Sequence, residues 1–265
     1  MPNVKVKDIN MYYELHGKGF PLIMIEGLSA SVDSWPPDFI QELSKSFKLI
    51  IFDNRGAGRT DKPDIDYSIK MFANDTESLM DALDIEQAHV FGMSMGGLIA
   101  QELVLNYPER VEKLILCSTN SGLSKSVLPS PEVMQILTKD IEGLSGEELI
   151  RMWIPLNFPE DFIKNNPDFI EDYVRRELMS PMPLHSYKHQ MSAVVKCNTR
   201  RRLKEINKPT LILQGEKDIM SPLQNAEFLE QNIPEAKLSI IPNCGHVLYA
   251  QEPKKVSKII IEFLD

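Results

Sequence analysis

Hydrophobic residues fall into two patterns along most of the chain. Continuous apolar runs that end in turns predict buried strands at 21–27, 47–53, 87–91, 111–117, 210–215 and 237–241. Alternating positions over 4–16 predict two further short strands. Helices are predicted at 37–46, 68–83, 98–107 and 256–264. This alternation of strands and helices predicts an α/β fold with a mostly parallel, doubly wound sheet covered on both faces.

The pattern changes between residues 121 and 203, where the buried-strand runs stop. Helix-like pieces alternate there with prolines, aromatic residues and methionines. We therefore expect a helical cap at 121–203, inserted into a core formed by 1–120 and 204–265. The candidate pocket residues of this cap are Trp153, Phe158 and Phe162. Its methionines Met179, Met182 and Met191 suit either a pocket lining or a plain core.

Composition and charge narrow the classes of function. With 265 residues, 43% of them apolar, the chain is long enough for one large α/β domain with an insertion. The formal net charge of −9 opposes binding to nucleic acid or to an anionic membrane surface. The N-terminal residues alternate charged with apolar side chains, unlike a signal peptide, and no later segment is long enough to span a bilayer. The sequence predicts a soluble, cytoplasmic protein without membrane insertion.

The remaining motifs indicate neither a cofactor nor a metal. The three cysteines lack Cys-x-x-Cys spacing, so a disulfide framework or a zinc knuckle is not expected. His185 and His189 are four residues apart but lack the acidic neighbour of His-Glu-x-x-His. Gly56 and Gly58 lack the third glycine of a dinucleotide-binding loop, because position 61 is aspartate.

Residues 92–97, Gly-Met-Ser-Met-Gly-Gly, place Ser94 between two glycines, after a predicted strand and before a predicted helix. In Gly-x-Ser-x-Gly the tight turn forces the serine toward positive φ, and the glycines let neighbouring backbone approach without a Cβ clash. The hydroxyl then projects above the sheet. The N–H of Met95 lies at a helix N-terminus, where unpaired donors favour an oxyanion. This hexapeptide can therefore supply a nucleophile and an anion stabiliser.

A serine hydroxyl needs a base and an orienting acid to act as a nucleophile near neutral pH. Asp218 and His246 each follow one of the last two predicted strands. The carboxyl ends of parallel strands share one edge, where ligands bind in open α/β folds. We therefore expect Ser94, Asp218 and His246 to converge there. Glu216 lies in the same turn as Asp218 and competes for the acid role.

The order Ser, Asp, His together with Gly-x-Ser-x-Gly resembles the α/β-hydrolase fold over nearly the whole chain. Further matches are Asp53-x-Arg55-Gly56-x-Gly58-x-Thr60, Tyr107-Pro108-Glu109-Arg110-Val111, Gly215-Glu216-Lys217-Asp218 and Gly245-His246. The set is most similar to small capped esterases, enol-lactone hydrolases and cofactor-free haloperoxidase-like enzymes. The resemblance implies an oxyanion hole made by the N–H groups of Leu28 and Met95.

Glu26 departs from this pattern, because the family has histidine at the position before the glycine of the oxyanion loop. An unpaired carboxylate there disfavours a developing negative charge in a low-dielectric site. Either burial keeps Glu26 protonated, or a cation pairs with it. We favour Arg55, at the end of the neighbouring strand, as that cation. The third alternative is a Glu26 that points to solvent.

Together these residues predict a serine hydrolase that cleaves carboxylic esters or lactones through an acyl-enzyme. Ser94 attacks, His246 transfers the proton and Asp218 orients the imidazole. One alternative is a perhydrolase or haloperoxidase-like activity, in which hydrogen peroxide replaces water on the acyl-enzyme. Another is a weakly catalytic ligand-binding receptor on the same fold. The expected partner is a small-molecule ester or lactone, and no pattern selects an oligomeric state.

Overall fold

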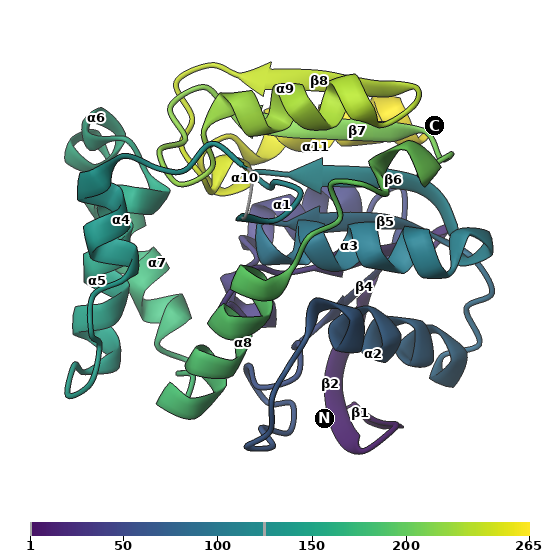
Figure 1. The fold of residues 1–265 in the computed structure, drawn as a ribbon, viewed down its shortest axis with the longest axis horizontal. Helices are drawn as coiled ribbons and strands as arrows, with labels where there is room; N and C mark the ends of the chain where they lie inside the picture. The colour runs from purple at the N-terminus through teal and green to yellow at the C-terminus, as the bar shows by residue number, and fades with distance from the viewer. Residues whose placement is uncertain (1, 124–125) are drawn as a thin grey trace.

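The computed structural model describes residues 2–123 and 126–265, and within them eight strands form one sheet in the order β1-β2-β4-β3-β5-β6-β7-β8 (Figure 1). The strands are β1 (Asn3–Val6), β2 (Ile9–His16), β3 (Pro21–Ile25), β4 (Lys48–Phe52), β5 (Ala88–Met93), β6 (Val111–Cys117), β7 (Thr210–Gly215) and β8 (Ala236–Ile241). β1, β2 and β4 pair antiparallel, whereas all pairings from β4 to β8 are parallel. The predicted mostly parallel sheet is confirmed.

Helices cover both faces of this sheet. In the core they are α1 (Pro37–Leu43), α2 (Ile69–Ala82), α3 (Met95–Asn106), α9 (Leu223–Asn232), α10 (Leu248–Gln251) and α11 (Pro253–Leu264), with the short 3-10 helices η1 (Val32–Ser34), η2 (Pro108–Arg110) and η4 (Leu203–Glu205). Successive side chains of β3 point to opposite faces: Ile23 and Ile25 belong to the buried cluster that includes α2, α3 and α9, and Leu22 and Met24 belong to the cluster that includes α1, α10 and α11. Two buried layers therefore enclose the sheet.

A layer of helices lies beyond the carboxyl ends of the parallel strands (Figure 1). It consists of α4 (Pro131–Leu137), α5 (Gly146–Asn157), α6 (Glu160–Asn165), α7 (Pro167–Glu177) and α8 (Leu184–Lys196). Local sequence starts these helices: at α5, Ser145 Oγ accepts from Glu148 N and Glu148 Oε2 accepts from Ser145 N, which forms a capping box. In the part of the chain that the structure describes, no helix has the length and apolar character needed to cross a membrane.

The chain enters and leaves the helical layer at neighbouring positions. It leaves the core after β6 and returns before β7, and these two strands are neighbours in the sheet. The two ends of the layer meet where Thr199 N–H donates to Ser121 O over 3.0 Å. The Thr199 hydroxyl also donates to Gln101 Oε1 of α3 at 2.6 Å. We call this contact the neck of the cap.

Candidate active site

The turn between β5 and α3 has the strained geometry that its sequence predicts. Ser94 has φ 53° and ψ −113°, and it is the residue between strand and helix. A Cβ on Gly92 or Gly96 would collide with backbone atoms of neighbouring segments, so glycine is required at both positions. Ser94 N–H donates to Cys117 O at 2.9 Å, and Thr119 Oγ1 donates to Ser94 O at 2.7 Å. These bonds to the end of β6 hold the turn in place.

His246 and Asp218 form a buried pair at the same edge of the sheet. The distance from His246 Nδ1 to Asp218 Oδ2 is 2.8 Å. Because the carboxylate accepts, Nδ1 donates the proton, and Nε2 remains the basic nitrogen. Asp218 Oδ1 accepts from the N–H groups of Met220 and Ser221, both at 2.9 Å, and Gln214 Nε2 donates to Oδ2 at 3.0 Å. The carboxylate is thus oriented by neutral donors.

The competing acid, Glu216, lies outside this arrangement. Its side chain is exposed, and Oε2 accepts from Asn243 N–H at 2.9 Å. The histidine is instead supported from the backbone side, where Ser118 Oγ donates to His246 O at 2.7 Å. Of the two acids in this turn, only Asp218 contacts His246 in the described part of the chain.

The two amides expected to form an oxyanion hole lie on either side of Ser94. Met95 is the first residue of α3, so its N–H has no acceptor within the helix. Leu28 lies in the loop after β3, between Gly27 and Ser29, whose N–H groups donate to side-chain oxygens. A Cβ on Gly27 would lie 3.3 Å from Ser94 Cβ, so this loop packs closely against the turn. Leu28 and Met95 both line the cavity described next.

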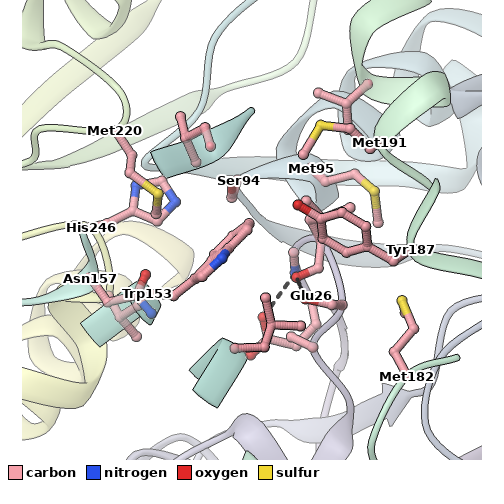
Figure 2. Close-up of a pocket in the computed structure, with 18 of the residues that line it drawn as sticks. Glu26, Ser94, Met95, Trp153, Asn157, Met182, Tyr187, Met191, Met220 and His246 are labelled. Atoms are coloured by element: carbon pink, nitrogen blue, oxygen red, sulfur yellow. Dashed lines mark hydrogen bonds between the residues drawn. The ribbon is translucent and has the colours of Figure 1, made fainter. Parts of the chain in front are cut away.

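A cavity of about 450 Å³ lies between the carboxyl edge of the sheet and the cap. Ser94 and His246 line its floor, and Figure 2 shows Trp153 and Tyr187 of the cap facing the same space. Trp153, one of the candidate pocket residues, is thus part of the cavity wall. Among the methionines, Met182 and Met191 line the cavity, whereas Met179 is 61% exposed. The wall is mostly apolar.

The prediction that Phe158 and Phe162 line the pocket was wrong. Neither belongs to the described residues of the cavity wall. The two rings stack with centroids 5.6 Å apart, and Phe158 meets Phe169 and Tyr173 edge-on at 5.6 and 5.0 Å. They join α6 and α7 to the end of α5. The sequence alone does not show whether an aromatic residue of the cap packs into a core or lines a pocket. The orientation of α5 determines which of the two occurs.

Glu26 lies beside the oxyanion loop and is 2% exposed, so the alternative of a solvent-facing side chain is wrong. Oε2 accepts from Gly27 N–H and Oε1 accepts from the Tyr249 hydroxyl, both at 2.9 Å. Burial raises the pKa of Glu26 to about 8. The geometry therefore matches the alternative of a protonated carboxyl.

The favoured pair of Glu26 with Arg55 was also wrong. Arg55 is 2% exposed and makes two hydrogen bonds with Asp75, at 2.8 and 2.9 Å. It makes two more with Asp8, at 2.8 and 2.7 Å. The guanidinium thus points away from Glu26, toward the β1–β2 hairpin and α2, where two carboxylates bind it in the bidentate geometry that arginine prefers.

Sequence reasoning missed four supporting residues. Ser118 and Thr119 directly follow the apolar run of β6, and this polar pair at the carboxyl edge was a usable signal. Gln214 is a polar residue within the apolar run of β7, which also marks it. Tyr249 carried no such signal, because its neighbours are apolar and its hydroxyl partner is 223 residues away.

The described residues offer no grouping of three His, Cys, Asp or Glu side chains that could hold a metal ion. His185 Nε2 lies 3.1 Å from the carbonyl oxygen of Lys62, and His189 Nε2 lies 2.7 Å from Asp64 Oδ1. The two histidines share a helix but have separate partners. They connect α8 to the loop that precedes α2.

Comparison with known proteins gives the family. Residues 21–253 match the family model of the alpha/beta hydrolase fold. The chain is 30% identical over 244 residues to a poly(3-hydroxyalkanoate) depolymerase of Ectopseudomonas oleovorans, covering 92% of this chain and 84% of that protein. It is 25% identical over 263 residues to a putative carbamate hydrolase of Azorhizobium caulinodans, covering 99% and 98%. The enol-lactonase from Burkholderia xenovorans has the same fold, with a TM-score of 0.86, 22% identity and 99% coverage of both chains. The chain therefore belongs to the α/β-hydrolase family, and its relatives include hydrolases.

Proposed function

We propose that this protein hydrolyses neutral carboxylic esters or lactones with an apolar acyl or alcohol group, through an acyl-enzyme on Ser94. The observation that carries the proposal is the strained turn that presents Ser94 to the same cavity as His246, whose Nδ1 donates to Asp218. The apolar wall of that cavity supports an apolar substrate.

In the proposed reaction, His246 Nε2 takes the proton of the Ser94 hydroxyl as the oxygen attacks the carbonyl carbon. The carbonyl oxygen becomes negative and accepts hydrogen bonds from the Leu28 and Met95 amides. His246 then protonates the leaving alcohol, and the C–O bond breaks to give the acyl-enzyme. Water attacks next, with His246 again taking the proton, and the acid leaves as Ser94 regains its hydrogen. Asp218 keeps the imidazole oriented throughout.

The charges of the cavity wall support a neutral substrate. Glu26 and Glu177 face the cavity, and no lysine or arginine is among the described residues that line it. Burial raises the pKa of Glu177 to about 7 and that of Glu26 to about 8. A carboxylate on the substrate would therefore lose its hydration without gaining a counter-ion.

We expect the enzyme to prefer a neutral ester over its carboxylate-bearing counterpart. For p-nitrophenyl butyrate against mono-p-nitrophenyl succinate, kcat/KM should be about tenfold higher or more for the butyrate, since the succinate carboxylate loses its hydration in the cavity without gaining a counter-ion. Both substrates release the same leaving group, so the ratio reports the acyl side. An equal or reversed ratio would contradict a neutral substrate.

Trp153→Ala should change which acyl chains are accepted. Its indole lines the cavity and meets the Tyr187 ring edge-on, with centroids 6.1 Å apart. Removing it lengthens the cavity, so kcat/KM for long relative to short p-nitrophenyl esters should rise about tenfold. The matched control is the rate at which a small fluorophosphonate labels Ser94, which should be nearly unchanged. If labelling and melting temperature fall together with hydrolysis, Trp153 is a core residue.

The proposed function is tested directly by fluorophosphonate labelling combined with a panel of p-nitrophenyl esters of increasing chain length. Stoichiometric labelling at Ser94 and turnover of at least one ester are expected. A protein that binds the esters but neither turns them over nor becomes labelled is a receptor on a hydrolase fold, and the proposal fails.

A further inference from the structure

Glu26 joins the two loops that surround the nucleophile. Its carboxyl accepts from Gly27 N–H, next to Leu28 on the oxyanion loop, and from the hydroxyl of Tyr249, both at 2.9 Å. Tyr249 lies on α10, three residues after His246. Asn54 Nδ2 also donates to Glu26 O at 3.1 Å. Glu26 is therefore fixed by both its backbone and its side chain.

Tyr249 is a rigid anchor for this bridge. It is 2% exposed, and its ring lies among those of Trp35, Phe39 and Phe91, with centroids 5.0, 5.2 and 6.2 Å away. Such packing leaves the ring no alternative position. The Tyr249 hydroxyl therefore holds the carboxyl of Glu26 in a fixed position. Through Glu26 it also positions the oxyanion loop.

The surroundings of Glu26 favour the protonated carboxyl. The titratable and charged groups that face it are Tyr173, Arg176 and Glu177 from α7, Cys117 from β6 and Tyr249 from α10. The one cation among them, Arg176, is bound elsewhere: it donates to Ser34 O at 3.1 Å and pairs with Asp172 at 3.3 Å. The two donors to the Glu26 carboxyl, Gly27 N–H and the Tyr249 hydroxyl, are uncharged and supply no counter-ion for a carboxylate.

From this geometry we propose that Glu26 acts as a neutral acid that positions the oxyanion loop, and that its ionisation slows acylation of Ser94. The proposal rests on the hydrolase reaction described above. An ionised Glu26 places a negative charge next to Leu28, whose N–H must stabilise a second negative charge on the substrate oxygen. Two like charges in a site shielded from water repel each other strongly. The neutral form keeps the bridge without that repulsion.

The pH profile of kcat/KM tests this proposal. Since the pKa of Glu26 is about 8, its protonated fraction falls about tenfold between pH 7 and pH 9. We expect kcat/KM for a neutral p-nitrophenyl ester to fall by about the same factor in the wild type. Glu26→Gln keeps the shape and stays neutral, so its profile should be nearly flat over this range. The rate of Ser94 labelling by a fluorophosphonate should follow the same two profiles.

Two further variants should shift the pH at which kcat/KM has fallen by half, the midpoint of the fall, in opposite directions. The Tyr249 hydroxyl bond stabilises the Glu26 carboxylate, so Tyr249→Phe should shift the midpoint to higher pH. The Glu177 charge destabilises that carboxylate, so Glu177→Gln should shift the midpoint to lower pH. A residue with a purely structural role would produce neither shift. If Glu26→Gln folds poorly, these two variants still test whether the ionisation of Glu26 controls the pH profile.

The outcomes separate this inference from the proposed function. An alkaline fall that persists in Glu26→Gln, or a wild-type profile without a fall between pH 7 and pH 9, overturns the role of Glu26 while ester hydrolysis stands. Failure of the wild type to label at Ser94 or to turn over any ester overturns the proposed function instead. Opposite midpoint shifts in Tyr249→Phe and Glu177→Gln support the role of Glu26.

Discussion

Replacing Ser94 by alanine should lower ester hydrolysis by roughly 10³-fold or more, because the serine, histidine and aspartate act as a unit and only binding to the oxyanion amides remains. His246→Ala should lose a comparable factor. The measurement is kcat for a p-nitrophenyl ester, together with a melting temperature to show that the variant is folded.

The control for Ser94→Ala removes a hydroxyl elsewhere. Ser78 lies on α2, outside the wall of the active-site cavity, so Ser78→Ala should hydrolyse esters at the wild-type rate. If Ser94→Ala kept a tenth of the wild-type activity, another residue would have to be the nucleophile, and the acyl-enzyme mechanism would be rejected.

The largest loss of stability is expected for Arg55→Met. Asp75 is almost completely buried and takes two hydrogen bonds from Arg55. Burial already raises the pKa of Asp75, although the Arg55 bonds oppose this rise. Removing the guanidinium leaves a buried carboxylate without a partner, which typically costs about 3–5 kcal/mol. Urea unfolding at pH 7 measures the difference.

Asp8→Asn is the matched control. It weakens the other ion pair of Arg55, with an aspartate whose side chain is 58% exposed. Solvent screening limits its cost to on the order of 1 kcal/mol or less. Its hydrogen bond with Arg55 lowers the pKa of Asp8 to about 2, so the contribution of Asp8 is present above pH 4 and is lost as the pH falls toward 2. Equal losses for the two variants would show that Asp75 is not the partner that matters.

The parts of the fold that the sequence predicts well are those governed by strand topology. Each buried run became a strand because a parallel sheet covered on both faces requires continuous apolar segments. His246 lines the same cavity as Ser94 and pairs with Asp218, because the carboxyl ends of parallel strands share an edge. Their convergence was therefore predictable without knowing a single side-chain direction.

The failed predictions all depended on side-chain direction. Arg55 and Glu26 do follow neighbouring strands, but the guanidinium is bound by Asp75 and Asp8 instead of Glu26. Phe158 and Phe162 do belong to the cap, but the orientation of the cap helices turns them into its own core. Neither hydrophobic period nor motif spacing encodes these orientations, which tertiary packing decides.

The neck of the cap has a consequence for how substrate range can diverge in this protein. Because Thr199 N–H donates to Ser121 O, the segment between these two residues is a loop whose ends already touch. Changing the length of such a loop alters its closure entropy only slowly, by about 0.6 kcal/mol per doubling. We expect that a chimaera in which this segment is exchanged for that of a relative changes the part of the cavity wall that the segment forms, while Ser94, Asp218 and His246 keep their places at the edge of the sheet.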